Sequence, residues 1–218
     1  MAEADAFLRE RFPGAAELIV VDDGSRPGEG VQDADMPPGV KLVVHPRNLG
    51  KGGAVRSGVR AAVGDYIVFT DSDLPFSLEP LAQTLAWLQD GADIVIGDRL
   101  MPESACEVDV GPLRRLSSAV FTGLVRRAAG LDFRDTQCGY KGYRAPVAKE
   151  LFGALEITSF AFDVEILLRA LRRGYRIRRQ SLRLVHNEDT SVRLSKHAPR
   201  MFADTIRIAW RARRGHYD

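Results

Sequence analysis

Tyr66-Ile67-Val68-Phe69-Thr70 runs without interruption into Asp71-Ser72-Asp73, and this stretch decides the fold. A short, continuous apolar run is typical of a strand buried in a parallel sheet, where ligands bind beyond the carboxyl ends of the strands. Asp71 and Asp73 follow at that end, and Mg²⁺ in proteins usually takes one or two carboxylates together with substrate phosphates. We therefore expect a strand that presents a metal site. An aspartate-rich turn is the alternative interpretation.

The segments on either side alternate between short apolar runs and helical patterns. Strands are expected over 17–21, 40–45, 93–97 and 176–185, and helices over 4–12, 54–63, 78–89, 113–129, 162–173 and 199–214. This alternation indicates an α/β fold with a mostly parallel sheet flanked by helices. The length of 218 residues fits one domain, so we interpret 1–218 as a single unit.

Composition narrows the class of protein further. Hydrophobic residues make up 45% of the chain, and the net charge is +2 with arginine concentrated after residue 113. A basic second half suits a phosphate or an acidic membrane surface, and a solvated basic face is the alternative. Cys106 and Cys138 form no CxxC pair, so neither a disulfide framework nor a zinc cluster is expected.

Neither a membrane-spanning segment nor a signal peptide is expected from the sequence. No apolar run approaches the roughly 18–20 residues that span a bilayer, and residues 1–11 lack a basic start and an apolar stretch. We therefore expect a cytoplasmic location, with any contact to the inner face of the cytoplasmic membrane made from its surface.

Two further segments carry residues suited to phosphate chemistry. Arg47-Asn48-Leu49-Gly50-Lys51-Gly52-Gly53 precedes a predicted helix, and a glycine-rich helix entry with a lysine favours bound anions. It is not a Walker A motif, and a plain helix-entry loop explains it equally. Asp22 and Asp23 follow the strand at 17–21, so they and Asp71 are expected to converge on one crevice.

The region 135–144 is polar and aromatic between two predicted helices, and we expect a loop. Lys141 and Arg144 in such a loop would suit an acceptor phosphate, with a solvated loop as the alternative. Asp163 and Glu165 open the next helix, where carboxylates favour the helix dipole. They are either capping residues or a carboxylate that faces an acceptor.

Two predicted helices are basic and amphipathic. The one at 113–129 fits packing against the sheet as well as a membrane surface. The C-terminal segment 199–218 carries Phe202, Ile206 and Trp210 beside several arginines, so we expect it to lie on an anionic membrane. Nucleic acid is not an expected partner, because aromatic residues are not interleaved with the basic stretches.

Taken together and in order, these motifs resemble family 2 glycosyltransferases, in particular the dolichyl-phosphate glucosyltransferase and mannosyltransferase branch. The resemblance covers the chain from residue 17 to about residue 207. The matching segments are 20–25, 47–54, 69–73, 97–99, 135–141 and 162–167. It implies a GT-A, Rossmann-like fold. The family begins with a strand that has no counterpart before Glu17, so the first strand is expected to be missing and the domain to be short at its N-terminus.

The resemblance also implies roles for the matching residues. A nucleotide would be held by Asp22, Asp23, Lys51, Gly52 and Asp71, and Mg²⁺ or Mn²⁺ by Asp71 and Asp73. An acceptor phosphate would meet Arg99, Arg114 and Ser118, with Arg115 an equal match for Arg114. An acidic catalytic residue would be Asp163 or Glu165, and the motif does not choose between them.

The implied activity is metal-dependent, inverting transfer of a hexose from a nucleotide sugar to a polyprenyl or dolichyl phosphate. The segment 135–141 is closest to the glucosyl branch, which favours UDP-glucose over GDP-mannose as donor. A phosphate monoester, with a second pKa of about 6, is already largely dianionic at neutral pH and needs little help from a base. The alternatives are transfer to a soluble saccharide, which requires a base, and a truncated, non-catalytic nucleotide-binding relative.

Overall fold

The structure is a computed structural model that describes residues 1–106, 123, 135–185 and 194–217. The helix expected at 113–129 lies outside these residues except for residue 123, which is helical. The described helices and strands are α1 (Ala2–Arg11), β1 (Ile19–Asp22), the 3₁₀ helix η1 (Asp33–Asp35), β2 (Lys41–Val44), α2 (Lys51–Ala61), β3 (Tyr66–Phe69), α3 (Pro80–Gln89), β4 (Ile94–Asp98), β5 (Ala105–Cys106), β6 (Lys141–Arg144), α5 (Ala145–Gly153), α6 (Phe162–Arg172), β7 (Ile177–Ser181), β8 (Arg183–Leu184) and α7 (Leu194–Arg213).

A four-stranded sheet in the order β3-β6-β4-β7 forms the centre of the molecule. β4 and β7 are parallel, whereas β6 runs antiparallel to both of its neighbours. β1 and β2 form a separate parallel pair, and β5 and β8 form another. Within the described residues, β1 and β3 are thus members of different sheets. The α/β fold with parallel strands and flanking helices is confirmed, with β6 as the antiparallel exception.

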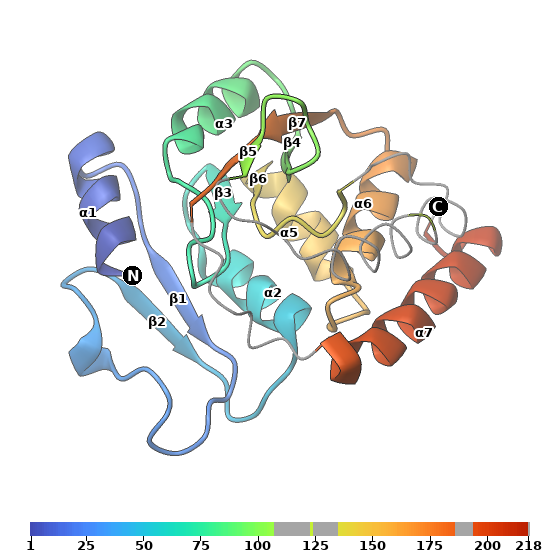
Figure 1. Cartoon of the computed structure of the whole chain (residues 1–218), viewed down its shortest axis with the longest axis horizontal. Coiled ribbons are helices and arrows are strands. Elements are labelled where there is room, and N and C mark those ends of the chain that lie inside the picture. The colour runs from blue at the N-terminus through green and yellow to red at the C-terminus, as the bar shows by residue number, and fades with distance from the viewer. Residues whose placement is uncertain (107–122, 124–134, 186–193, 218) are drawn as a thin grey trace.

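The helices cover both faces of the central sheet (Figure 1). In β4, Ile94 and Ile96 point into the larger core with α5 and α6, while Val95 points to the opposite face. Val95 packs there against Leu88 of α3. The two directions arise because successive side chains of a strand point to opposite faces of the sheet. Because β4 is buried on both faces, its sequence is a continuous apolar run rather than an alternating one.

Four aromatic rings form the centre of the larger core, next to the carboxyl end of β3. Phe69 lies 6.3 Å from Tyr143, 6.4 Å from Phe152 and 6.2 Å from Phe162, measured between ring centroids. These rings come from β3, β6, α5 and α6. The end of β3, and with it Asp71, is therefore set by side chains from four elements.

The expectation of a loop over 135–144 was wrong for its second half, which is strand β6 at the middle of the sheet. Gly142 permits this position, because a Cβ atom there would lie 2.5 Å from Cγ2 of Thr84 on α3. The strand at 176–185 is divided into β7 and β8, and α5 was not anticipated. The start of α2 lies at Lys51 rather than 54, directly after Gly50 with its φ of 88°.

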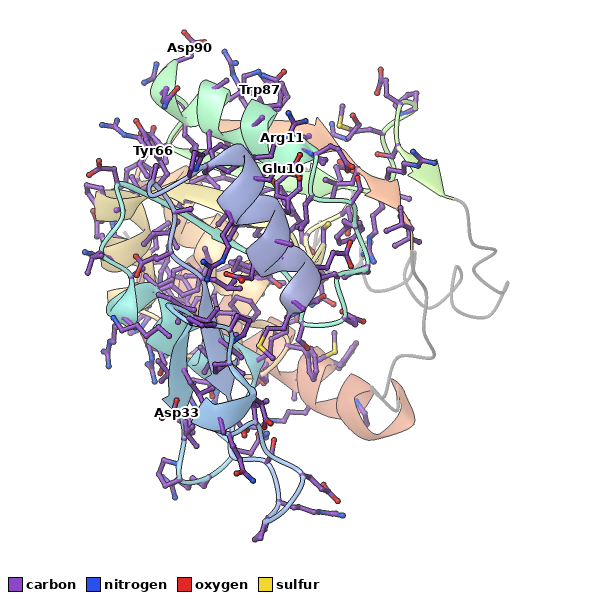
Figure 2. All side chains as sticks on the ribbon, turned by 90° about the vertical axis from the view of Figure 1, so that its left-hand side faces the viewer. Glu10, Arg11, Asp33, Tyr66, Trp87 and Asp90 are labelled. Carbon is purple, nitrogen blue, oxygen red and sulfur yellow. The ribbon has the colours of Figure 1, made fainter. Side chains whose placement is uncertain are left out.

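α1 packs beside α3 at the edge of the molecule. Figure 2 shows Arg11 at the end of α1 close to α3, and a hollow of about 170 Å³ lies between the two helices. Its lining residues are Phe7, Arg11, Phe12, Glu79 and Ala82. None of these residues is among the predicted site residues.

Candidate active site

Asp71 lies two residues beyond the end of β3, and its carboxylate contacts residues from two distant segments. Oδ1 lies 2.7 Å from Nζ of Lys51, the first residue of α2. On another side, the carboxylate lies against Gly139, where a Cβ atom would come within 1.9 Å of Oδ2. Only a residue without a side chain leaves room for the carboxylate here. Segments around 51, 71 and 139 thus converge on one carboxylate at the tip of β3.

A second, deeper ion pair lies close to the first. Nζ of Lys141 is 2.7 Å from Oδ1 of Asp163, and both side chains are buried. Nζ also donates a hydrogen bond of 2.6 Å to the carbonyl oxygen of Cys138 and lies 5.5 Å from the ring of Phe69. The lysine of β6 therefore has a fixed position, held by the start of α6 and by the 135–140 segment.

The two pairs act on each other through their charges. Burial raises the pKa of Asp163, although the cations of Lys141 and Lys51 oppose this shift. Burial alone would lower the pKa of Lys51, but the carboxylates of Asp71 and Asp163 outweigh it, so that pKa is raised. Lys51 is therefore held in its cationic form beside Asp71, as a partner for an anionic ligand would be.

An oriented arginine follows β4 at the same end of the sheet. Arg99 forms a bidentate contact with Asp135, with Nε to Oδ2 at 2.7 Å and Nη2 to Oδ1 at 2.8 Å. Burial raises the pKa of Asp135, but the hydrogen bonds from Arg99 outweigh it and hold that pKa below its usual value. Because the carboxylate fixes the guanidinium plane, Arg99 presents its remaining exposed edge in a defined direction.

Asp22 and Asp23 are engaged by the polypeptide backbone. Asp22 accepts hydrogen bonds from the backbone N–H groups of Ser25 and Val31, and the bonds from Ser25 lower its pKa. Asp23 accepts from the N–H groups of Leu49 and Gly50, both at 2.8 Å. Asp23 thereby ties the glycine-rich segment to the end of β1, which positions Lys51 at the start of α2.

His45 extends this connection into α2. Its Nδ1 lies 2.7 Å from Oδ1 of Asp23, and its Nε2 lies 2.8 Å from Oγ of Ser57. Ser57 lies inside α2, where the surrounding N–H groups belong to the helix and leave no donor pair for an oxyanion. We interpret the hydrogen-bonded series Asp23–His45–Ser57 as a polar link between β1, β2 and α2 rather than as a nucleophile with its base.

Comparison with known families decides the assignment. The model described as "Glycosyl transferase family 2" matches residues 5–152, more than half of the chain. The chain belongs to glycosyl transferase family 2. The family that the motifs resembled is therefore confirmed, and Asp71 lies in the matched part of this family 2 chain.

The curated relatives of this family 2 chain include two that share one name and a third described as a glycosyltransferase. A dolichyl-phosphate beta-glucosyltransferase of Drosophila melanogaster is 34% identical over 184 residues, which cover 76% of this chain and 55% of the relative. A human dolichyl-phosphate beta-glucosyltransferase is 32% identical over 186 residues, which cover 77% of this chain and 56% of the relative. Glycosyltransferase AglD of Haloferax volcanii is 31% identical over 163 residues, covering 74% of this chain and 26% of the relative. The chain thus spans between a quarter and little more than half of these relatives.

Solved structures share the fold at lower identity. Glucosyl-3-phosphoglycerate synthase of Mycobacterium tuberculosis, in complex with UDP, has a TM-score of 0.61 and 20% identity, covering 88% of this chain and 69% of its own. Mannosyl-3-phosphoglycerate synthase of Rubrobacter xylanophilus has a TM-score of 0.65 and 20% identity, and the match covers 97% of this chain and 68% of that structure's chain. These likenesses establish the GT-A-like fold of the family 2 chain.

Several residues predicted from the sequence gather around Asp71 in this family 2 chain. Lys51 and Asp163 lie there, and Asp73 follows in the exposed turn after β3. Gly52 is buried instead, since a Cβ atom there would lie 2.6 Å from Cβ of Phe162. It allows α2 to approach α6 closely and has no face open to a ligand.

Two predicted site residues lie elsewhere, and two are not described. Glu165 is fully buried and accepts hydrogen bonds from Nε of Arg169 and from the N–H of Ile157. It ties α6 to the preceding loop, which is a structural role, and its catalytic role stays a prediction. Arg144 pairs in register with Tyr66, three residues from Lys141 and about 10 Å from the Asp71 end of the sheet. Arg144 lies 3.6 Å from Asp93 there, and its acceptor-phosphate role stays a prediction. Arg114 and Ser118 lie outside the described residues.

Asp135 and Gly139 had no predicted chemical role, and Lys141 was predicted to lie on a loop. The structure shows Asp135 orienting Arg99, Gly139 making room for Asp71, and Lys141 paired with Asp163. The one available signal was that all three fall in the segment 135–141, which the resemblance had already singled out.

The buried pair gives a stability prediction. Replacing Asp163 by Asn should leave Lys141 as an uncompensated buried charge and lower the free energy of unfolding by about 3–5 kcal/mol. Replacing both, as Lys141→Met with Asp163→Asn, should recover most of that loss because no charge remains buried. Urea unfolding followed by circular dichroism measures all three proteins.

The single Lys141→Met variant adds a pH test. Asp163, whose pKa burial already raises, loses its cation in this variant, so its folded-state pKa rises further above the unfolded value. A group of this kind contributes stability at low pH that disappears as pH rises through the folded-state pKa. Lys141→Met should therefore regain stability relative to wild type as pH falls from neutral. A difference that is constant with pH would contradict the buried pair.

Proposed function

We propose that this chain transfers a hexose from a nucleotide sugar, with UDP-glucose favoured, to a polyprenyl phosphate. The observation that carries the proposal is the carboxylate of Asp71, held at the tip of β3 between Lys51 and Gly139 in a family 2 chain. The names of the Drosophila and human relatives support a glucosyl donor and a dolichyl-phosphate acceptor. UDP in the structure of the mycobacterial neighbour supports the uridine nucleotide.

The residues around Asp71 fit a divalent metal. Asp71 and Asp73 offer hard oxygen donors two positions apart, the type that Mg²⁺ and Mn²⁺ prefer. Within the described part of the chain, no cluster of three or more His, Cys, Asp or Glu side chains could hold a metal. Phosphate oxygens of the donor would therefore have to complete the coordination. A bound metal would supply Lewis-acid stabilisation of the leaving diphosphate. A mycobacterial neighbour crystallised with Mn²⁺ and UDP supports this assignment.

The chain's own cations complete the binding of phosphate. Lys51 is kept protonated beside Asp71, and its ammonium group can shift to a donor phosphate when that anion arrives. Arg99, oriented by Asp135, offers a second positive charge at the same end of the sheet. We assign Arg99 to the acceptor phosphate, so that donor and acceptor anions are held by separate cations.

Burial of the two candidate bases favours an acceptor that is already an anion. The side chains of Asp163 and Glu165 are only 3% and 0% exposed, and each is paired with a cation. Neither is placed to take a proton from a neutral hydroxyl at the surface. A phosphate monoester is largely dianionic at neutral pH, so it can act as nucleophile once it is positioned. Asp163 is then a positioning residue that keeps Lys51 charged.

The acceptor class places the reaction at a membrane. Among the described helices, none combines the length and apolar character needed to cross a bilayer. We propose peripheral contact with the inner face of the cytoplasmic membrane. The chain would reach the phosphate of a lipid-linked acceptor from the aqueous side of that membrane.

The metal role is tested with Asp73→Asn. Loss of one carboxylate should lower metal-dependent transfer of glucose from UDP-glucose to polyprenyl phosphate by about 100-fold or more, as removal of charge stabilisation at a leaving group does. Asp65→Asn is the matched control, because this exposed aspartate precedes the opposite end of β3. Metal-dependent transfer that survives in Asp73→Asn, or falls equally in Asp65→Asn, would refute the assignment.

The acceptor is tested with a matched pair of substrates. Polyprenyl phosphate and the corresponding free polyprenol differ only in the phosphate group. If the chain provides no base, transfer to the phosphate should be readily measured and transfer to the alcohol should be lower by about 100-fold or more. Equal rates with the two acceptors would contradict a phosphate nucleophile, and a preference for soluble sugars would favour the saccharide alternative.

A further inference from the structure

The outer face of α7 carries a row of apolar side chains exposed to solvent. Phe202, Ile206 and Trp210 have relative exposures of 52%, 47% and 53%. They are spaced by four residues, so they fall on one face of the helix and extend over about 12 Å. Large apolar side chains gathered in this way mark an interaction surface more often than isolated ones do.

A row of arginines runs alongside this stripe. Arg200 and Arg207 are seven residues apart in α7, which places them one above the other at about 100° from the apolar row, and Arg214 follows in the turn directly after the helix. All three are exposed, and the guanidinium carbon of Arg214 lies 3.8 Å from the ring centroid of Trp210. The two rows together form a surface that is apolar in its centre and cationic along one side.

The opposite face of α7 holds the helix on the domain. Thr205, Ile208 and Ala212 are buried. Asp204 is the only acidic residue of the helix. Oγ of Ser159 donates a hydrogen bond of 2.6 Å to its Oδ2, and the same oxygen lies 3.9 Å from Nε of Arg200. Nη1 of Arg211 contacts Glu156. The helix is therefore fixed by contacts that the apolar row does not share, and its single carboxylate is already paired with Arg200.

We propose that this face of α7, formed by Phe202, Ile206, Trp210 and the Arg200-Arg207-Arg214 row, docks the domain onto an anionic phospholipid membrane. The apolar row would enter the boundary between headgroups and acyl chains, and the arginines would lie at the level of the lipid phosphates. α7 lies along the outer edge of the molecule (Figure 1), so no other described element covers this face.

Charge decides between a membrane and a second copy of the chain. In a symmetric dimer, the same patch faces itself, which would bring the arginine row of one copy close to that of the other. The one acidic residue of α7, Asp204, already pairs with Arg200, so α7 has no second carboxylate to neutralise the repulsion between the Arg207 and Arg214 side chains of two copies. An anionic lipid surface supplies the missing charge and also accommodates the aromatic side chain of Trp210.

The proposal extends the proposed function, in which the acceptor's lipid tail lies in a membrane, and its test uses lipid alone so that the two can fail separately. The probe is flotation with vesicles of equimolar phosphatidylglycerol and phosphatidylcholine, without nucleotide or acceptor. The wild-type chain should float with these vesicles, and binding should weaken as salt is raised or phosphatidylglycerol is omitted.

Two variants identify the surface. Replacing Arg200, Arg207 and Arg214 together by Gln should lower the partition coefficient by about 100-fold, since each basic residue near an anionic surface contributes a factor of about five. Replacing Phe202 and Trp210 together by Ser should also abolish most of the flotation. The matched control replaces the exposed residues Arg9, Arg60 and Lys149 by Gln, removing the same charge from α1, α2 and α5.

The outcomes separate the possibilities. Loss of flotation in the α7 variants with retention in the control supports the proposal. Unchanged flotation in the α7 variants, or an equal loss in the control, would overturn it. A second result would also overturn it: the wild-type chain sediments as a dimer, Trp210→Ser dissociates that dimer, and the chain does not bind vesicles. Circular dichroism verifies folding, and glucosyl transfer to a short, water-soluble polyprenyl phosphate, expected to be unchanged in the arginine variant, reports on the active site independently.

Discussion

The ion pair between Asp71 and Lys51 is the contact on which the site depends. It joins the carboxyl end of β3 to the first residue of α2, two elements that ligand-binding α/β folds use for charged substrates. The positions of both residues depend on contacts made by their neighbours. Asp23 draws the glycine-rich segment toward β1 through two backbone N–H groups, and the aromatic cluster around Phe69 fixes the end of β3. The pair is the meeting point of these two constraints.

The buried pair of Lys141 and Asp163 gives this site its electrostatic background. A carboxylate and an ammonium group are each costly to bury alone, and they persist here because they neutralise each other close to a second pair. The result is an alternating arrangement of positive and negative groups that keeps Lys51 charged. Asp71 and Asp163 together therefore keep Lys51 available as a cation for the phosphate that we propose it binds.

The sequence predicts the parts of this arrangement that depend on local pattern. The apolar run before Asp71 indicated a strand tip, and the glycines around Lys51 indicated a helix entry. The rest depends on geometry between distant segments. Asp163 and Glu165 are two residues apart and differ by about 200° around α6, so only the packed helix shows which one approaches Asp71. Lys141 resembles a loop residue until its buried partner is placed, and the direction of β6 takes Arg144 away from the site.

The most direct test of this account is calorimetric titration of the wild-type chain with UDP in the presence and absence of Mn²⁺. If Asp71 shares a metal with the donor's diphosphate while Lys51 moves to a phosphate oxygen, UDP should bind at least about tenfold more tightly with Mn²⁺ than without it. Binding of UDP that is equally tight with and without the metal, or absent at millimolar ligand in both conditions, would contradict the central claim.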